Sequence, residues 1–196
     1  QPAADDLTPH TEAMLLRRMK GRATSTRARG LALAAVREAF EETGIVVGRA
    51  AETPQSTDPA TAGRAAETWS AFRATGHQPV LSPLTLFARA ITPPGRARRY
   101  DTRFFLAPAS AISTTTPHRD EELSHIDWFT FDEVRGLDLP VITRAIVEDL
   151  AQRLAAHGIQ AAAEEAMPFY YFQAGAFRRQ LLAHDGTTSA PVIWRR

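Results

Sequence analysis

The residues best suited to chemistry lie in the segment VREAFEETGIVVG, at positions 36–48. In a helix, which turns by about 100° per residue, Glu38, Glu41 and Glu42 lie on one face. Arg37 lies on the flank of that face nearest Glu41. Three like charges near a helix C-terminus repel one another and oppose the helix dipole, so stability alone favours lysine or arginine there. A solvated acidic face is the simpler interpretation, but a divalent cation among the carboxylates would remove the repulsion.

The ligand chemistry narrows the choice of cation. Oxygen ligands without histidine or cysteine suit Mg²⁺ or Mn²⁺. The chain contains no cysteine, which excludes disulfides, zinc thiolate sites and a cysteine nucleophile. Mg²⁺ held by a few carboxylates usually completes its coordination shell with water and substrate phosphates. The pattern therefore predicts a metal site that acts on a phosphate-bearing substrate.

The segment REAFEETGI resembles the C-terminal half of the Nudix box, G-x5-E-x7-R-E-U-x-E-E-x-G-U, where U is aliphatic. The residues on its fixed positions are Arg37, Glu38, Glu41, Glu42, Gly44 and Ile45, with Ala39 at a U position. The resemblance implies that Glu38, Glu41 and Glu42 bind Mg²⁺ or Mn²⁺. It also implies that Arg37 orients a glutamate by a salt bridge, and it makes Glu38 one of two candidates for the general base.

The first half of the box does not match, because Ala23 and Arg29 stand where its Gly and Glu are expected. Two explanations are open. The motif has decayed in a non-catalytic relative, or the chain resembles a branch of the family in which a long insertion separates a Gly-Gly turn from the carboxylate helix. This branch includes coenzyme A diphosphatase-like proteins. We favour the second explanation, in which residues 1–29 are mostly insertion and the Gly-Gly turn and early strands are expected upstream of Gln1.

A further acidic candidate precedes the segment LSHIDWFTF. The resemblance implies that a glutamate in such a loop supplies a metal ligand or the general base, and Glu122 is preferred over Glu121. A solvated loop glutamate is the alternative. His118 and His125 lie nearby, but a lone histidine in a loop is more often incidental.

Arginines of the segment GRARRYDTR are candidates for binding phosphate, since a guanidinium group matches phosphate oxygens. Arg103, within a predicted strand, and Arg99 are preferred over Arg96 and Arg98. A basic hairpin tip without function is the alternative, because Lys20 is the only lysine and arginine is common throughout the chain.

The hydrophobic pattern predicts the elements that position these residues. Helices are predicted over TEAMLLRRMK (11–20), LALAAVREAFEETG (31–44), RAAETWSAFRATG (64–76), FDEVRGL (131–137, with Asp132 as cap) and PVITRAIVEDLAQRLAAHG (140–158). Strands are predicted over IVVG (45–48), TLFARAIT (85–92), YDTRFFLAPA (100–109) and HIDWFTF (125–131). The turn PPGRAR between the second and third of these strands predicts an antiparallel pair.

Uneven alternation of strands and helices predicts an α/β fold with a mixed sheet. The resemblance implies a Nudix-type α/β/α sandwich with an N-terminal helical insertion (1–29), a core (30–157) and a C-terminal helical extension (158–196) on the same domain. Core positions are predicted for Trp69, Phe72 and Trp128. The four aromatics at 169–172 are expected to cover the cleft or to form a homodimer contact, with core packing of two of them as the alternative.

Composition excludes several classes of protein. The chain of 196 residues is 44% hydrophobic and 23% charged, which permits a packed core. Its net charge of +1 favours neither nucleic acid nor a membrane surface as a partner. No apolar run approaches the roughly 20 residues of a membrane span, and no signal peptide is visible. We therefore expect a cytoplasmic protein.

Together these observations predict a metal-dependent hydrolase that cleaves a diphosphate linkage in a nucleoside diphosphate derivative. The resemblance implies coenzyme A or acyl-coenzyme A as the substrate, so the partner is a nucleotide-type small molecule. The alternative is a catalytically inactive Nudix-fold module that binds a nucleotide or regulates another process.

Overall fold

The computed structural model describes residues 3–52, 63–95, 97–117 and 127–193, and within 159–164 it describes the backbone alone. The chain divides into two compact units. The first comprises residues 1–84 and 106–126, and the second comprises residues 85–105 and 127–196. The predicted division at residues 29 and 157 stays a prediction.

The first unit combines helices with a small antiparallel sheet. Its elements are α1 (Pro9–Leu16), α2 (Ser25–Thr43), β1 (Ile45–Ala50), α3 (Arg64–Ala74), β2 (His77–Pro79), the 3₁₀ turn η1 (Ala109–Ala111) and β5 (Ile112–Thr115). The sheet order is β2-β1-β5, and β1 is antiparallel to both neighbours. The three helices and the one strand predicted before residue 77 are all present, although their first or last residues differ from the predicted ones.

The second unit is built on a mixed sheet. Its elements are β3 (Thr85–Ile91), β4 (Asp101–Leu106), α4 (Phe131–Arg135), α5 (Val141–Glu164), β6 (Met167–Gln173), β7 (Ala176–Leu182) and β8 (Val192–Ile193). The sheet order is β4-β3-β6-β7-β8, in which β3 and β6 are parallel while β7 is antiparallel to β6 and β8. The predicted mixed α/β class with a mixed sheet is thus confirmed, and β3 and β4 are neighbours as predicted.

An aromatic cluster holds α2 against α3 in the first unit. Phe40 and Phe72 are at most 1% exposed, and their ring centroids lie 5.1 Å apart. Trp69 adds a third ring, 5.6 Å from Phe72, so both predicted core aromatics of α3 belong to this cluster. Edge-to-face pairs of this kind add to the stabilisation that burial already gives. The cluster fixes the helix that carries the glutamates.

The abrupt turn from α2 into β1 depends on Gly44. Its φ of 71° is left-handed, and its N–H donates to the carbonyl of Phe40 at 2.9 Å, which ends the helix. A Cβ atom at this position would lie 2.2 Å from the carbonyl oxygen of Thr116, so a side chain cannot be accommodated. The glycine of the motif is therefore required by the fold of the first unit.

The strand predicted over residues 125–131 is absent from the part of that range that the structure describes, so this prediction was wrong there. Residues 127–130 form no strand, and Trp128 is 75% exposed rather than in the core. The side chain of Asp127 accepts a hydrogen bond from the N–H of Trp128 at 2.8 Å, which satisfies locally a donor that a strand would pair with its neighbour.

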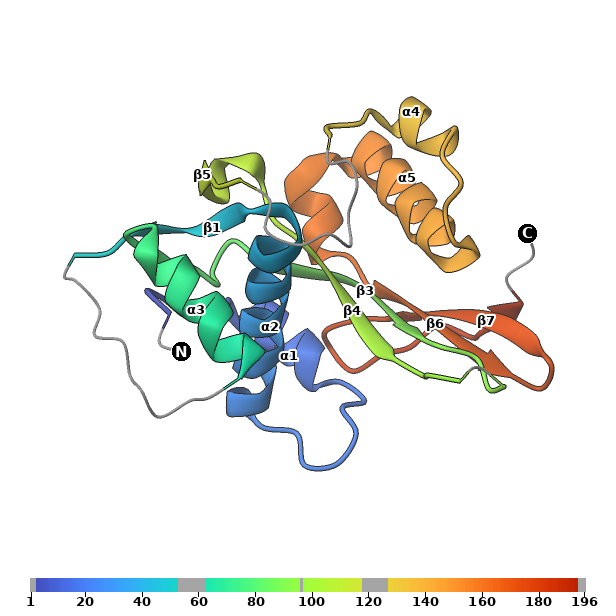
Figure 1. The fold of residues 1–196 in the computed structure, drawn as a ribbon. Helices are drawn as coiled ribbons and strands as arrows, with labels where there is room; N and C mark the ends of the chain where they lie inside the picture. Colours follow the sequence, from blue (N-terminus) through green and yellow to red (C-terminus); the bar gives the residue numbers. More distant parts are fainter. Residues whose placement is uncertain (1–2, 53–62, 96, 118–126, 194–196) are drawn as a thin grey trace. The chain divides into compact units, whose positions relative to one another are not determined.

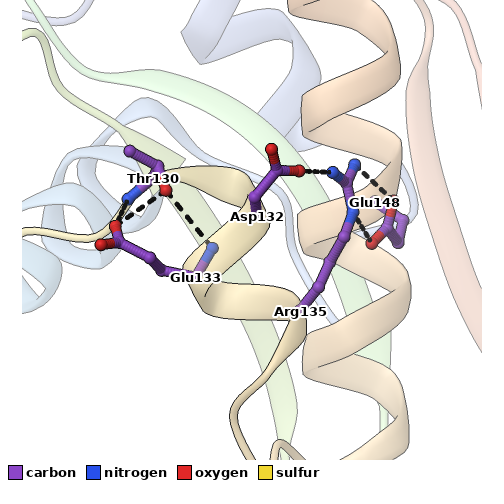
Figure 2. Close-up of polar contacts among 5 residues, drawn as sticks. All are labelled: Thr130, Asp132, Glu133, Arg135 and Glu148. Carbon is purple, nitrogen blue, oxygen red and sulfur yellow. Dashed lines mark hydrogen bonds and ion pairs between the residues drawn. The ribbon is translucent and has the colours of Figure 1, made fainter.

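The predicted cap of α4 is also corrected. The cap is Thr130 rather than Asp132, and it forms a capping box with Glu133 (Figure 2). Asp132 lies inside the first turn and pairs with Arg135 at 2.6 Å. The sequence Thr-x-x-Glu was the signal for this cap.

The C-terminal segment forms strands instead of the predicted helical extension. The parallel neighbour of β3 is β6, and β7 returns antiparallel to it (Figure 1). Ala174 and Gly175 join the two strands with φ of 49° and 76°, which matches the turn that two-residue hairpins favour. The run of aromatics that precedes this turn has strong β propensity, which outweighs the weaker helical pattern.

Two of the four consecutive aromatics pack in the core of the second unit. Phe169 is 5% and Tyr170 is 1% exposed, whereas Tyr171 and Phe172 are only half-buried. This is the simpler of the two alternatives for the segment, and the homodimer contact stays a prediction. Among the described residues, no helix carries an apolar stretch long enough to cross a membrane.

Candidate functional site

Helix α2 presents its carboxylates because another face of the helix is buried. Ala28, Ala32, Val36 and Phe40 recur every four residues and are at most 1% exposed. Side chains at this spacing form one continuous stripe along a helix. The glutamates of the motif lie off this stripe, as the periodicity predicted.

The glutamates of α2 differ in environment. The side chain of Glu38 is 49% exposed, that of Glu41 is 12% exposed, and Glu42 is of intermediate burial. Arg37 joins two of them, since its Nη2 donates to Glu38 and its Nη1 donates to Oε2 of Glu41 at 3.3 Å. These ion pairs are a geometric basis for the orienting role predicted for Arg37, which itself stays a prediction.

A second arginine, Arg64, reaches Glu41 from the neighbouring helix. It is the first residue of α3, and its Nε donates to Oε1 of Glu41. Each carboxylate oxygen of Glu41 therefore accepts a hydrogen bond from a different arginine. Sequence reasoning missed Arg64, because 23 residues separate it from Glu41 and only the packing of α3 on α2 brings them together.

An open cavity of about 730 Å³ is lined by α2 and α3 beside this ion pair. Its described lining comprises charged Glu41, Arg64 and Glu67, the hydroxyls of Thr68 and Ser70, and apolar Phe40, Ala71 and Ala74. A second cavity, of about 600 Å³, shares the three apolar residues and adds Thr75, Thr114, Thr116 and Pro117. Polar and charged side chains beside apolar ones can contact both the polar and the apolar parts of a small molecule.

The chemistry of the donors fits a hard divalent cation, because Mg²⁺ and Mn²⁺ prefer carboxylate oxygens. In the structure these carboxylates do not form a complete ligand set. Among the described residues, no three His, Asp or Glu side chains converge on one point. Glu38 and Glu41 instead pair with arginines. Binding a cation therefore requires these side chains to exchange partners. The assignment of Glu38, Glu41 and Glu42 as metal ligands stays a prediction.

Arg29, which stands where the Nudix box has its first glutamate, has a structural contact of its own. Its guanidinium pairs with Asp6, and its Nη1 donates to the carbonyl of Asp5 at 3.2 Å. Arg29 thus ties the N-terminal segment to α2 and adds no carboxylate to the helix. Ala23, at the expected glycine, is an exposed residue before α2.

The predicted phosphate-binding arginines lie in the second unit, around β4. Arg103 is 11% exposed, and its Nη1 donates to the backbone carbonyl of Asp101 at 2.6 Å. Arg99 is exposed and donates to the carbonyl of Thr92 at 3.1 Å. Both roles in substrate binding stay predictions.

Arg89 is a buried cation that the sequence did not reveal. It is 3% exposed, and it forms two hydrogen bonds of 2.7 Å with the carboxylate of Asp101. Its guanidinium also lies 5.0 Å from the ring centroid of Phe169. These contacts join β3, β4 and β6, so Arg89 has a structural role in the second unit.

Some predicted candidates lie outside the described residues. They are Glu121 and Glu122, with His118, His125 and Arg96. The role of Glu122 as a metal ligand or general base therefore stays a prediction.

No family model matches the chain, and no curated protein matches it. A search of solved structures finds similarity to the crystal structure of a NUDIX hydrolase from Alicyclobacillus acidocaldarius, with 24% identity and a TM-score of 0.48. The match covers 78% of this chain and 74% of that one. Similarity at this level does not assign the chain to a family, and the fold and site define it as a mixed α/β protein with an acidic helix beside an open cavity.

Proposed function

We propose that the protein is a metal-dependent hydrolase that cleaves a diphosphate linkage in a nucleoside diphosphate derivative. One observation carries the proposal. Glu41, a fixed residue of the half-matched Nudix box, lines an open cavity and lies one helical turn from Glu38. A carboxylate face of this kind beside a cavity suits an ion that must contact both protein and substrate.

The four charged residues of the motif in α2 each have a part in this proposal. Glu38, Glu41 and Glu42 hold Mg²⁺ or Mn²⁺, and Arg37 keeps Glu38 and Glu41 oriented. When bound, the cation supplies charge neutralisation at the phosphates and lowers the pKa of water. Glu38 or Glu122 accepts the proton of the attacking water as general base.

The proposed substrate is coenzyme A or acyl-coenzyme A. The support is the sequence resemblance of residues 28–155 to the branch of the Nudix family that includes coenzyme A diphosphatase-like proteins. The cavity lining also combines charged Glu41, Arg64 and Glu67 with apolar Phe40, Ala71 and Ala74, which suits a ligand with a phosphate group and a less polar remainder.

The test is hydrolysis by Glu41→Gln and Glu42→Gln variants. The substrate panel is coenzyme A, ADP-ribose, NADH, dinucleoside polyphosphates and nucleoside triphosphates, each with Mg²⁺ and with Mn²⁺. Each variant should lose about 100-fold or more in metal-dependent rate, since a metal contributes several kcal/mol and about 1.36 kcal/mol is tenfold.

A matched control for charge is Glu52→Gln, which removes an exposed carboxylate of the same unit outside the motif. Its rate should equal that of the wild type, and circular dichroism should show all three variants folded. Wild-type rates in both Glu41→Gln and Glu42→Gln would remove the metal-site assignment.

A second candidate is a nucleotide-binding or regulatory module without catalysis. The observation that favours it is the contact of Arg29 with Asp6, because the motif expects a glutamate at position 29. Tight binding of a panel nucleotide without turnover, under any metal condition, would support this function instead.

A further inference from the structure

The two cavities beside α3 share one wall. Phe40, Ala71 and Ala74 line both of them, so the cavities adjoin each other. Residues of α3 and its C-cap, from Arg64 to Thr75, line the pair over about 16 Å, because a helix rises by about 1.5 Å per residue. The two cavities therefore form one continuous hollow in the first unit, which we call the α3 cleft.

The two ends of the α3 cleft differ in charge. The first cavity has three charged residues in its described lining, Glu41, Arg64 and Glu67. The described lining of the second cavity carries no charged side chain, and its polar side chains are those of threonines. Removal of a charge from water costs far more than removal of a neutral polar group that finds a hydrogen-bond partner. The threonine-lined end therefore favours an uncharged group.

The charged end has a different requirement. Its described lining has two carboxylates, Glu41 and Glu67, and one guanidinium, that of Arg64, which already donates to Glu41. A diphosphate at this end is repelled by the excess of negative charge unless the cation of the proposed function is bound there. The threonine-lined end has no such need for a cation.

The threonine hydroxyls define the kind of uncharged group that fits. The hydroxyl of Thr116 donates to the carbonyl of Gly44 at 3.3 Å, so its oxygen is left to accept a hydrogen bond. Thr114 is exposed, and its hydroxyl has no hydrogen bond to another described residue, so it can donate or accept. Beside the apolar side chains of Ala71 and Ala74, these hydroxyls suit a partly apolar group with N–H donors and acceptors.

We infer that the threonine-lined end of the α3 cleft binds the uncharged organic part of the substrate, while the diphosphate lies at the charged end. A nucleoside and the amide-bearing pantetheine chain of coenzyme A share the required chemistry. The inference rests on the proposed function, and it makes Ala71 a specificity-determining residue. Ala71 belongs to the shared wall, so a larger side chain there narrows the cleft between its two ends.

The experiment uses the full chain without metal, and adenosine and pantetheine as separate probes in calorimetric or NMR titrations. Neither probe carries a phosphate, so binding requires neither the cation nor catalysis. The wild type should bind one probe more tightly, which identifies the source of the organic group. Ala71→Leu should bind that probe about tenfold weaker or more, because added methylenes clash with a ligand packed on the wall.

A matched control is Ala65→Leu. Ala65 is an exposed residue of the same helix and lines neither cavity, so this variant should bind the probe as the wild type does. Leucine is a good helix former at both positions, and circular dichroism should show both variants folded.

A second pair of variants tests the hydroxyls. Thr114→Val keeps the shape of the side chain but removes a hydrogen-bonding group, so binding of the probe should weaken about two- to tenfold. Thr115→Val makes the same change at the next residue of β5, which is exposed and lines neither cavity, and should leave the affinity unchanged.

The inference is overturned if neither probe binds the wild type, or if Ala71→Leu binds the probe as tightly as Ala65→Leu. Hydrolysis separates this outcome from a failure of the proposed function. If Ala71→Leu and the wild type cleave a panel substrate with the same KM, the inference falls and the proposed function stays. If the probes bind as expected but no panel substrate is cleaved with either metal, the binding site for the organic group stands and the proposed hydrolysis falls.

Discussion

Asp149 of α5 accepts hydrogen bonds from two side chains of the neighbouring strands. Its Oδ1 and Oδ2 each lie 2.9 Å from a nitrogen of Arg179, and Oδ2 also accepts from the hydroxyl of Tyr170. Tyr170 is 1% exposed, so its phenol is shielded from water beside a negative charge. Burial raises the pKa of Tyr170 above its ordinary value of 10.0, and the hydrogen bond to Asp149 raises it further.

The raised pKa of Tyr170 predicts the behaviour of this protein in alkali. The phenol is protonated in the folded chain and ionises near pH 10 in the unfolded chain, so stability should fall as pH rises above about 10. Ultraviolet titration should show a tyrosine component that ionises above the ordinary value of 10.0, and that late component should be absent in Tyr170→Phe. A late component that persists in Tyr170→Phe would contradict the assignment.

Helix α4 is short, and side chains form hydrogen bonds and ion pairs at both of its ends. Thr130 and Glu133 cap its N-terminus, and Arg135 near its C-terminus contacts Glu148 of α5 at 2.8 and 3.1 Å (Figure 2). Hydrogen bonds from the backbone and side chain of Thr130 lower the pKa of Glu133. A hydrogen bond from Arg135 lowers that of Glu148.

Substitution of Thr130→Ala tests the cap. It removes the hydroxyl but keeps the backbone N–H that donates to Glu133 at 2.7 Å, so the pKa of Glu133 should rise part of the way to 4.5. A lowered carboxylate pKa stabilises the fold above about pH 4.5, and this contribution is lost as pH falls through the folded value. NMR titration of the glutamate side chains is the measurement. Glu148 is the internal control, and an unchanged Glu133 would contradict the capping geometry.

Local patterns in the sequence predicted most of the helices and strands. The elements that were predicted wrongly or missed have physical explanations. The four-residue stripe of α2 and its glycine stop were sufficient to place the acidic face. The strand predicted around Trp128 failed because Asp127 and Thr130 satisfy the backbone locally. The hairpin of β6 and β7 was missed because its signal is a two-residue turn, Ala174 and Gly175, in a long aromatic segment.

The candidate site was predictable only within one helix. Arg37 and the glutamates follow from helical geometry, because they lie within a few residues of one another. Arg64 does not, since its contact with Glu41 depends on the packing of two helices through Phe40 and Phe72. The pair of Arg89 and Asp101 likewise depends on the register of separate strands.

The chain contains two compact units, and each of them consists of two segments that are distant in sequence. The core of the first unit centres on Phe72, which contacts the rings of Phe40 and Trp69. The second has a buried residue, Leu182, at the end of β7. Proteins often open in contiguous cooperative parts, and compact units of this kind are candidates for such parts.

Hydrogen exchange followed by mass spectrometry tests whether the two units open separately. Phe72→Ala should cost about 3–5 kcal/mol and Leu182→Ala about 2–5 kcal/mol, because both side chains are fully buried. The first variant should lose protection in α2, α3 and β1 while β6 and β7 keep theirs, and the second should show the reverse. Equal loss throughout the chain in both variants would mean that the units unfold as one. In that case Glu41 and Arg64 would lose their contact whenever either core is weakened.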